Sequence, residues 1–286
     1  MKKMGSKIWV GNGLESQNKG QLGHTLDGNI GNLFDIPLFS SDKDRVLNII
    51  GEWLSMPPSQ KLRRAKWIAT VNPEFVMETE KDKNFKEILR NETSLNVVDG
   101  IGLVWAREVE KGNNWFKVGM EILRGEHKDQ IASGADLMLD LARMAQEKGK
   151  KIFLLGGFGN RAEKTADFLR GKFGLEAKQI AWSEGEPNVS NKEVIEKINK
   201  FKPDILLVAY GMKKQEFWIG DNLKKLDVGL VMGVGRSFDY YSGELKRAPG
   251  WVRKMGMEWL FSLIKEPKRW RRQLALPRFV WKVLVK

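Results

Sequence analysis

Residues 151–173, KIFLLGGFGNRAEKTADFLRGKF, decide the fold class of this chain. The run from Lys151 to Leu155 is apolar and has the length of a strand, and it ends in a glycine-rich turn. From Arg161 to Phe173 the apolar residues follow a helical pattern. A strand that leads through a glycine turn into a helix is the repeating unit of a parallel α/β sheet.

The same alternation continues on both sides of this unit. Further strands are predicted at Trp67 to Val71, Leu95 to Val98, Gln179 to Trp182, Ile205 to Ala209 and Val228 to Met232. Further helices are predicted at Gly134 to Lys148, Lys192 to Phe201 and Lys214 to Leu226. The fold class is therefore α/β, with a Rossmann-like, largely parallel sheet covered by helices. Such sheets bind ligands at the carboxyl ends of their strands.

The composition divides the 286 residues into three segments. Residues 1–31 are rich in Gly, Asn and Gln and are predicted to be a loose N-terminal extension, while residues 32–244 form the α/β domain. Residues 245–286 hold twelve Lys or Arg and two acids, so they carry +10 of the formal net charge of +13. They are predicted to form a basic, Trp- and Arg-rich helical appendage.

The residue types exclude several kinds of site. There is no cysteine, which excludes disulfides, a thiol nucleophile and cysteine-ligated metals, and the two histidines are far apart in the sequence. No apolar run approaches the roughly 18 residues that span a bilayer, and the N-terminal apolar run is too short for a secretory signal. We therefore expect a cytoplasmic protein whose chemistry rests on carboxylates, amides, bases and backbone.

The appendage has the composition of a membrane-surface segment. Its basic residues are interleaved with Trp251, Trp259, Trp270 and Trp281; cations bind anionic head groups, and indole rings favour the water boundary. Two other interpretations stay open, a helical hairpin that packs its apolar stripe on the main domain and a nucleic-acid patch. Because no nucleic-acid motif is present, we expect no nucleic-acid partner and favour a peripheral location on the inner face of the plasma membrane.

Two predicted strands end in polar side chains. Thr70 and Asn72 precede Pro73 at the end of one strand, and Asp99 precedes Gly100 at the end of the next. A carboxylate placed directly after a buried strand can act as general base on a substrate hydroxyl. Each of these side chains could instead cap the helix that follows, and the residues alone leave both interpretations open.

Three glycine-rich strand ends predict a nucleotide or sugar-nucleotide pocket. Their candidate binding residues are Gly156, Gly157, Gly211, Lys214, Gln215, Gly233, Gly235 and Asp239. Amides exposed by glycines bind diphosphate, and lysines at a helix start oppose the helix dipole unless an anion is bound. Gly157, Gly159 and Ala162 also fit the G-x-G-x-x-A pattern, so a nicotinamide-dependent Rossmann oxidoreductase is an alternative.

The sequence predicts no metal site. Asp42-Lys43-Asp44 has the letters of a metal-binding D-x-D motif. It follows Ser40-Ser41 and opens a helix predicted from Arg45 to Leu54, so helix capping explains it better. Neither a metal ion nor a cofactor is expected.

Taken together, these motifs resemble the WecG/TagA/CpsF family of bacterial glycosyltransferases over about Leu33 to Leu276. The stretches that carry the resemblance are Thr70-Val-Asn72-Pro-Glu, Val98-Asp99-Gly100-Ile-Gly102, Gly134-Ala-Asp136-Leu, Phe153-Leu-Leu-Gly156-Gly157, Gly211-Met-Lys-Lys214-Gln215-Glu216, Gly233-Val-Gly235-Arg-Ser-Phe238-Asp239, and Arg247-Ala-Pro249 followed by Gly256-Met-Glu258-Trp259-Leu. The resemblance implies an inverting, metal-independent transfer of a sugar to the 4-hydroxyl of polyprenyl-diphosphate-linked N-acetylglucosamine. The expected donor is UDP-N-acetylmannosamine, and the expected product leads to wall teichoic acid or a related glycan.

The resemblance also implies roles for particular residues. Asp99 is the implied general base. The implied substrate contacts are Thr70, Asn72, Gln215, Arg247, Arg253 and Lys254. The last three would reach phosphates of the lipid or the leaving group, and the appendage would dock on an anionic membrane and close the site. A homo-oligomer stays open.

Three positions depart from the family pattern near the presumed donor pocket. Gln130-Ile131-Ala132-Ser133 occupies a place where Arg is common, Arg236 replaces a glycine, and Lys213 replaces a proline. A donor such as UDP-glucose or an N-acetylmannosaminuronic acid nucleotide therefore stays open. So does a third class of function, a non-enzymatic membrane or nucleic-acid adaptor that relies on the basic appendage.

Overall fold

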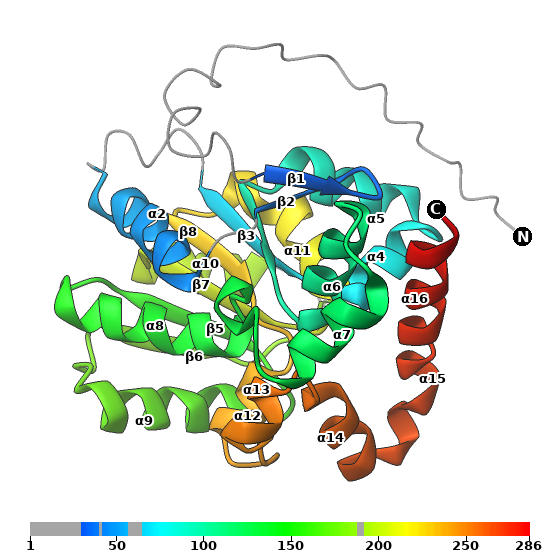
Figure 1. Ribbon diagram of the computed structural model, residues 1–286. Coiled ribbons are helices and arrows are strands. Elements are labelled where there is room, and N and C mark those ends of the chain that lie inside the picture. The colour runs from blue at the N-terminus through cyan, green and yellow to red at the C-terminus, as the bar shows by residue number, and fades with distance from the viewer. Residues whose placement is uncertain (1–29, 40–41, 57–64, 188–191) are drawn as a thin grey trace, which may run out of the picture.

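An eight-stranded sheet forms the centre of the computed structural model, which describes residues 30–39, 42–56, 65–187 and 192–286 (Figure 1). The strands are β1 (Ile30–Leu33), β2 (Ile36–Phe39), β3 (Lys66–Val71), β4 (Leu95–Val98), β5 (Ile152–Gly156), β6 (Ile180–Ser183), β7 (Ile205–Ala209) and β8 (Leu230–Gly233). Their order across the sheet is β1-β2-β4-β3-β8-β7-β5-β6. Only β1 and β2 pair antiparallel among these strands, so the predicted α/β class is confirmed.

Helices connect the strands and cover both faces of the sheet. They are α2 (Lys43–Ser55), α4 (Pro73–Thr79), α5 (Lys83–Glu87), α6 (Ile101–Glu110), α7 (Trp115–Leu123), α8 (Gly134–Glu147), α9 (Arg161–Phe173), α10 (Lys192–Phe201), α11 (Lys214–Asn222), α12 (Ser237–Tyr241), α13 (Gly250–Lys254), α14 (Glu258–Lys265), α15 (Trp270–Gln273) and α16 (Ala275–Val285). Short 3-10 turns lie at Lys128–Gln130, Leu223–Lys225 and Pro267–Arg269, and a π turn at Ile88–Glu92.

All six predicted strands are present, within two residues of the expected bounds. The sequence interpretation missed β1 and β2. Ile30 and Gly31 belong to β1, so the sheet begins inside the segment that was predicted to be loose, and residues 1–29 lie outside the described residues. The predicted helix from Lys214 ends at Asn222, and a 3-10 turn follows it.

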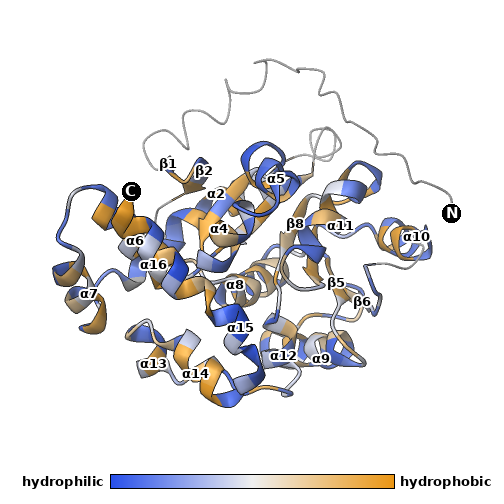
Figure 2. Ribbon diagram, turned by 90° about the vertical axis from the view of Figure 1, so that its right-hand side faces the viewer, coloured by the Kyte–Doolittle hydropathy of each residue, from blue (hydrophilic) through white to orange (hydrophobic). Residues whose placement is uncertain are grey.

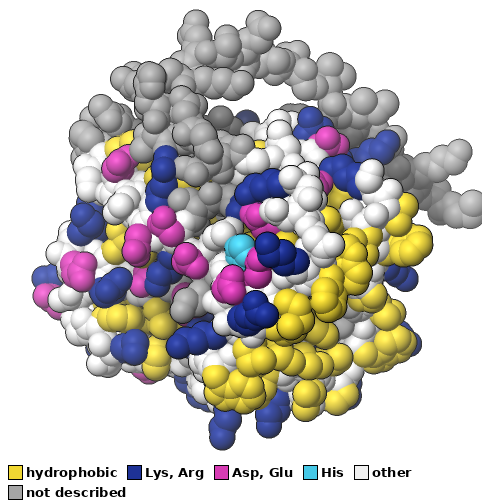
Figure 3. Space-filling view, viewed as in Figure 1, with side chains coloured by type: hydrophobic (Ala, Val, Ile, Leu, Met, Phe, Trp, Pro, Cys, Tyr) yellow, Lys and Arg dark blue, Asp and Glu magenta, His cyan; other side chains and the backbone are white. Residues whose placement is uncertain are grey.

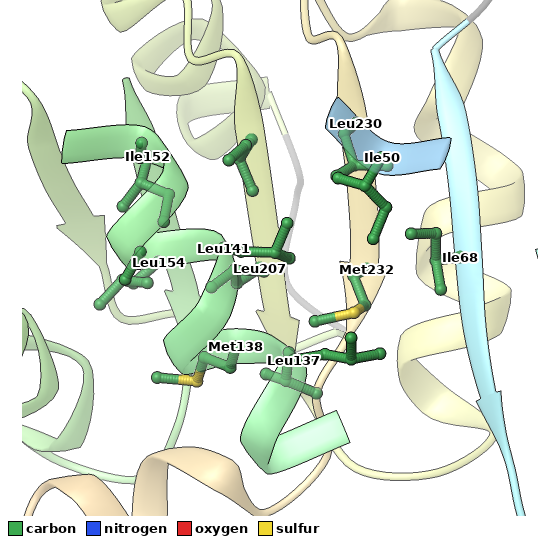
Figure 4. Packing of buried hydrophobic residues seen from close by; sticks show 14 of the residues in the cluster. Ile50, Ile68, Leu137, Met138, Leu141, Ile152, Leu154, Leu207, Leu230 and Met232 are labelled. Carbon is green, nitrogen blue, oxygen red and sulfur yellow. The ribbon is translucent and has the colours of Figure 1, made fainter. Parts of the chain in front are cut away.

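Alternate residues of each strand pack on opposite faces of the sheet, which creates two layers of core. On β5, Ile152 and Leu154 belong to the layer beneath α2, α8, α9 and α12, whereas Phe153 and Leu155 face α10 and α11. Figure 4 shows Leu141 of α8 lying against the strand residues of the first layer. The helices α4, α5, α6 and α16 complete the second layer, and the loops at the carboxyl edge are left free to form a site.

The C-terminal segment forms four short helices, α13 to α16, in place of a helical hairpin, but the packing of an apolar stripe on the main domain, which the hairpin alternative expected, is present in α16. Helix α16 packs on α4 and α6 and buries Phe279 and Val283 in the core, where Phe279 meets Phe34 edge to face at 6.3 Å. Figure 1 shows α13 and α14 below the sheet and α15 and α16 returning along its side. In the described segments, every helix is too short or too polar to cross a membrane.

Candidate active site

A cavity of about 540 Å³ lies at the carboxyl ends of β3, β4, β7 and β8, beneath the C-terminal helices. The predicted site residues that line it are Thr70, Asn72, Asp99, Gly211, Gln215, Gly235, Arg247, Arg253 and Lys254. Because neighbouring parallel strands end at one edge of the sheet, side chains far apart in the sequence meet here. The C-terminal helices contribute Trp259, Arg272 and Leu276 to the opposite wall.

Asp99 lies half-buried at the end of β4. Its backbone N–H donates to the carbonyl of Val71 at 2.7 Å, and the N–H of Gly134 donates to its carboxylate. The helix that follows begins after Gly100, whose φ is +121°, and has no side-chain cap. The capping interpretation of Asp99 is therefore wrong, and its carboxylate is held at the start of α8 instead.

The surroundings of Asp99 suit a group that exchanges protons. Burial raises its pKa to about 7, and the negative charges of Glu258 and Asp136 act in the same direction. The Gly134 amide and the Arg247 guanidinium partly oppose this rise. A carboxyl group with a pKa near neutral pH can both accept and release a proton, which is what a general base requires.

Arg247 joins the C-terminal segment to the start of α8. Its two terminal nitrogens bind the two carboxylate oxygens of Asp136 at 2.6 and 3.0 Å, and its Nε donates to Glu258 at 3.2 Å. Although burial opposes the charged form, these two carboxylates raise the pKa of Arg247, and Arg247 lowers the pKa of Asp136 against the effect of burial. The guanidinium is therefore a fixed cation at the start of α8, the same place where the Asp99 carboxylate is held.

Arg253 and Lys254 lie beside this ion pair. Arg253 is 3.6 Å from Asp136, and its Nε is a buried donor that has no hydrogen-bond partner among the described residues. Lys254 is exposed at the cavity wall. Buried donors are rarely left unpaired, so this corner of the cavity is suited to an anionic group.

Thr70 and Asn72 have structural contacts as well as places in the cavity wall. The hydroxyl of Thr70 donates to the carbonyl of Gly233 at 3.3 Å and joins β3 to β8. The side-chain oxygen of Asn72 accepts from the N–H of Phe75 at 3.1 Å, so the capping interpretation of Asn72 is confirmed. Both residues fix the shape of the wall around Asp99.

Gln215 and Glu216 form a buried hydrogen-bonded pair at the start of α11. The Gln215 amide accepts from the N–H of Gly235 at 3.0 Å and donates to Glu216 at 2.7 Å, and Glu216 accepts from the N–H of Lys213 at 2.6 Å. A Cβ at Gly233 would lie 2.5 Å from the Gln215 nitrogen. Gly233 is therefore needed for packing and lines neither cavity, while Gln215 holds the turn after β8.

A second cavity of about 470 Å³ adjoins the first and shares Gly211, Gly235 and Arg236 with it. Its further lining residues include Gly157, Phe158, Lys214 and Asp239. Gly156 lines neither cavity, because it packs on Tyr210: a Cβ there would lie 2.8 Å from the tyrosine ring. The predicted glycine turns thus surround one space, with Gly157 and not Gly156 at its wall.

The family model described as glycosyl transferase WecG/TagA/CpsF family matches residues 31–286. The chain belongs to this family. Three relatives are each named N-acetylglucosaminyldiphosphoundecaprenol N-acetyl-beta-D-mannosaminyltransferase. They come from Bacillus spizizenii W23 (30% identity, 77% of this chain and 79% of the relative), Bacillus subtilis 168 (29%, 76% and 78%) and Staphylococcus aureus MW2 (29%, 76% and 79%). Membership makes the protein a glycosyltransferase, in preference to the oxidoreductase and adaptor alternatives.

Two departures of this WecG/TagA/CpsF member form ion pairs. Lys213 binds Glu78 at 2.7 Å and Asp82 at 2.9 Å, so for this lysine two acids of the chain supply the negative charge that was expected from a bound anion at the start of α11. Arg236 binds Asp239 and Glu266 at 3.3 and 2.5 Å. The third departure is the segment from Gln130 to Ser133. The side chain of Gln130 bonds Arg107 and His127 and lines neither cavity, whereas Ile131 and Ser133 line the first cavity, where Ser133 accepts from Arg247 at 3.1 Å.

Asp239 lines the second cavity and forms ion pairs with two arginines. It accepts from Arg161 at 2.6 Å and from Arg236 at 3.3 Å. The Nη1 of Arg236 is buried and has no hydrogen-bond partner in the part of the chain that the structure describes. Asp239 itself lines the second cavity, so its predicted contact with a ligand stays a prediction, and it also holds Arg236 at the same cavity.

Sequence reasoning did not identify Asp136 and Glu258 as site residues, although both lie in stretches that carried the family resemblance. The missing signal was their pairing with Arg247, which is 111 residues from Asp136. The D-x-D interpretation is resolved in favour of capping, since Asp42 accepts from the N–H of Arg45 at 2.7 Å. Within the described residues, one group, Glu121 with Glu126 and His127, has metal-ligating side chains close together, and none of the three lines either cavity.

Proposed function

We propose that this enzyme transfers N-acetylmannosamine from UDP-N-acetylmannosamine to the 4-hydroxyl of N-acetylglucosamine on a polyprenyl diphosphate. The transfer inverts the anomeric centre, requires no metal ion, and supplies a cell-wall polymer such as wall teichoic acid. The names of the relatives support the sugar and the acceptor. The single observation that carries the proposal is the carboxyl of Asp99, with a pKa of about 7, in a cavity that Arg247, Arg253 and Lys254 also line.

Inversion follows from a single displacement. The acceptor O4 forms a bond to the anomeric carbon while the bond from that carbon to the UDP oxygen breaks, and the electron pair leaves with UDP. Asp99 accepts the proton of the attacking hydroxyl, an effect typically worth about 10² to 10⁴ in rate. One displacement with one base needs no second carboxylate as nucleophile.

The second cavity is the proposed donor site. Diphosphate in this cavity would be within the reach of the Gly157 and Gly235 backbone and of Lys214 and Arg236. The buried unpaired Nη1 of Arg236 gives a donor for one phosphate oxygen. Amides and cations that are fixed before the reaction stabilise the charge that develops on departing UDP without metal coordination.

The first cavity is the proposed acceptor site. Arg253 and Lys254 would bind the diphosphate of the lipid carrier, and Arg247 would hold the wall between that diphosphate and Asp99. The C-terminal helices would exclude water that could hydrolyse the donor. Their basic and indole side chains would keep the enzyme peripherally bound to the anionic inner face of the plasma membrane.

The variant Asp99→Asn tests the base. We expect kcat to fall by about 10² to 10⁴ with a UDP-sugar and a short-chain lipid diphosphate acceptor. We also expect unchanged UDP affinity and, at about pH 8, equal or greater stability, because the neutral amide removes a buried charge. Near-normal turnover in this variant would refute the assignment. Matched Glu163→Gln, on the exposed surface of α9, should leave both quantities unchanged.

The donor is tested separately by a panel of UDP-sugars. N-Acetylmannosamine, glucose and N-acetylmannosaminuronic acid donors are incubated with the acceptor, and the products are weighed by mass spectrometry. We expect the N-acetylmannosamine donor to have the highest kcat/KM. If another donor has the highest kcat/KM, the proposed donor sugar is wrong, whereas the proposed role of Asp99 still stands.

A further inference from the structure

Helix α7 presents a cluster of large apolar side chains to solvent. Its inner side packs on α6 and buries Val118 and Ile122. The outer side carries Trp115, Phe116, Met120 and Leu123, with exposed fractions of 52, 61, 38 and 47%. Single exposed apolar residues are ordinary, but four on one helix of nine residues are typical of an interaction surface.

The α7 cluster is continuous with exposed indole rings of the C-terminal helices. A Cβ at Gly125, just after α7, would lie 3.6 Å from the carbonyl oxygen of Lys254 at the end of α13. Trp251 and Trp259 follow on α13 and α14, at 66 and 44% exposed. Figure 3 shows hydrophobic side chains gathered on the lower right of this face, in the region where Figure 1 draws α7 and the C-terminal helices. Figure 2 shows apolar stretches on both α7 and α14.

Basic residues accompany this apolar surface. Arg124 follows α7, and Lys254, Lys268, Arg271 and Arg278 lie on the C-terminal helices; all five are exposed. These five form no ion pair with the other residues that the structure describes. Cations beside indole rings and aliphatic side chains match a bilayer with anionic head groups. Two copies of the chain joined through this face would instead bring like charges together.

We infer that α7 and the C-terminal helices form one lipid-binding surface, in which α7 inserts Phe116, Met120 and Leu123 into the interfacial layer of an anionic membrane. This inference rests on the lipid-linked acceptor of the proposed function. It adds α7 to the segment whose composition predicted membrane contact. Trp259 belongs to this surface and also lines the acceptor cavity, so a carrier diphosphate can reach the cavity without leaving the membrane.

A single fluorophore tests the contact directly, because the chain has no cysteine of its own. Phe116→Cys, labelled with an environment-sensitive dye, is mixed with vesicles of phosphatidylcholine and phosphatidylglycerol. We expect a blue shift and quenching by lipid-attached nitroxides. The control Trp182→Cys, on β6 at the far edge of the sheet, should show neither effect. A label at 116 that stays in water on vesicle-bound protein would overturn the inference.

A triple variant separates membrane contact from chemistry. Phe116→Ser, Met120→Ser and Leu123→Ser together should weaken vesicle binding by about tenfold or more, since each removes apolar area from the bilayer interface. Transfer to a water-soluble short-chain acceptor should be unchanged, and Trp182→Ser should alter neither. Unchanged vesicle binding in the triple variant, with its thermal melting intact, contradicts the inference.

Two further outcomes have distinct meanings. A dye shift that grows with protein concentration without vesicles, together with a dimer in sedimentation velocity, would mean that α7 binds a second copy, and would overturn the lipid assignment. If the unmodified enzyme fails to glycosylate the soluble acceptor while the label at 116 enters lipid, the proposed function fails and the lipid-binding surface stands.

Discussion

Asp99 and Glu216 are carboxyl groups whose pKa values burial raises to about 7, from 3.8 and 4.5. In both cases the hydrogen bonds that they accept act in the opposite direction. Because the folded-state pKa values exceed the unfolded ones, the folded chain binds more protons than the unfolded chain between about pH 4 and pH 7. The free energy of unfolding therefore decreases as the pH rises through this window, insofar as these two groups determine it.

The pH profile of the reaction should report Asp99. We expect kcat/KM to rise about tenfold per unit below about pH 7 and then to level off, because only the ionised carboxylate accepts the hydroxyl proton. Replacing a negative neighbour by Glu258→Gln lowers the pKa of Asp99, so the midpoint moves to lower pH. Initial rates measured from about pH 5 to pH 9 check both effects, and an unmoved midpoint in Glu258→Gln speaks against Asp99 as the titrating base.

Glu216 should be sensitive even to an isosteric change. Its two oxygens accept from Gln215 and from the Lys213 N–H, so the position needs two acceptors, and a glutamine offers one. We expect Glu216→Gln to lose about 1 to 3 kcal/mol of stability in urea unfolding, because two donors then face each other in a buried site. Glu163→Gln at an exposed position is the control; equal midpoints for the two variants would disprove the two-acceptor requirement.

Among the elements, those with an uninterrupted apolar or helical pattern were predictable, and those whose pattern is interrupted were not. Strand β4 and helix α9 have the expected bounds, because an apolar run and a helical pattern specify them locally. Strands β1 and β2 have four residues each, and Gly31 and Pro37 interrupt their patterns. Their pairing depends on the sheet edge that the rest of the chain provides, which no local pattern contains.

The candidate site was predictable only in part, for a related reason. Thr70, Asn72 and Asp99 meet because consecutive parallel strands end at one edge, so a rule about strand ends was enough. The ion pair between Arg247 and Asp136 joins residues 111 positions apart in the sequence. Whether these two residues meet depends on how the chain between them folds, which no local pattern predicts. The charge count showed that the appendage is basic, but it did not show which acidic side chain each Lys or Arg would bind.

Helix α16 should depend on one buried ring. Phe279 is 1% exposed and packs on Phe34, whereas the neighbouring Val280 is 40% exposed. We expect Phe279→Ala to cost about 3 to 5 kcal/mol in chemical unfolding, by loss of buried area and a cavity, and Val280→Ala to cost little. Limited proteolysis should release the C-terminus in the first variant alone. Equal protection of both would mean that α16 is held by its surface ion pairs.

At the scale of the whole molecule, the positive charge is concentrated in residues 245–286. We expect the combined changes Lys268→Gln, Arg271→Gln and Arg278→Gln to weaken binding to anionic vesicles about a hundredfold, at about 1 kcal/mol for each cation near the surface. Removing three exposed lysines elsewhere, by Lys148→Gln, Lys178→Gln and Lys200→Gln, is the matched control. Co-sedimentation with vesicles measures the binding of both variants. An equal loss of binding in the two would mean that the membrane attracts the net charge of the protein and not a defined face.

The ion pair between Arg247 and Asp136 also bears on how the enzyme is made. Residues 245–286 contribute to the lining of the first cavity and follow the sheet and Asp99 in the sequence, so they leave the ribosome after both. A nascent or prematurely ended chain that stops before Arg247 has Asp99 without the cation and the cover that complete its surroundings. We therefore expect a chain that stops before Arg247 to lack sugar-transfer activity, so that synthesis of the C-terminal helices would decide when the site begins to act on activated sugar.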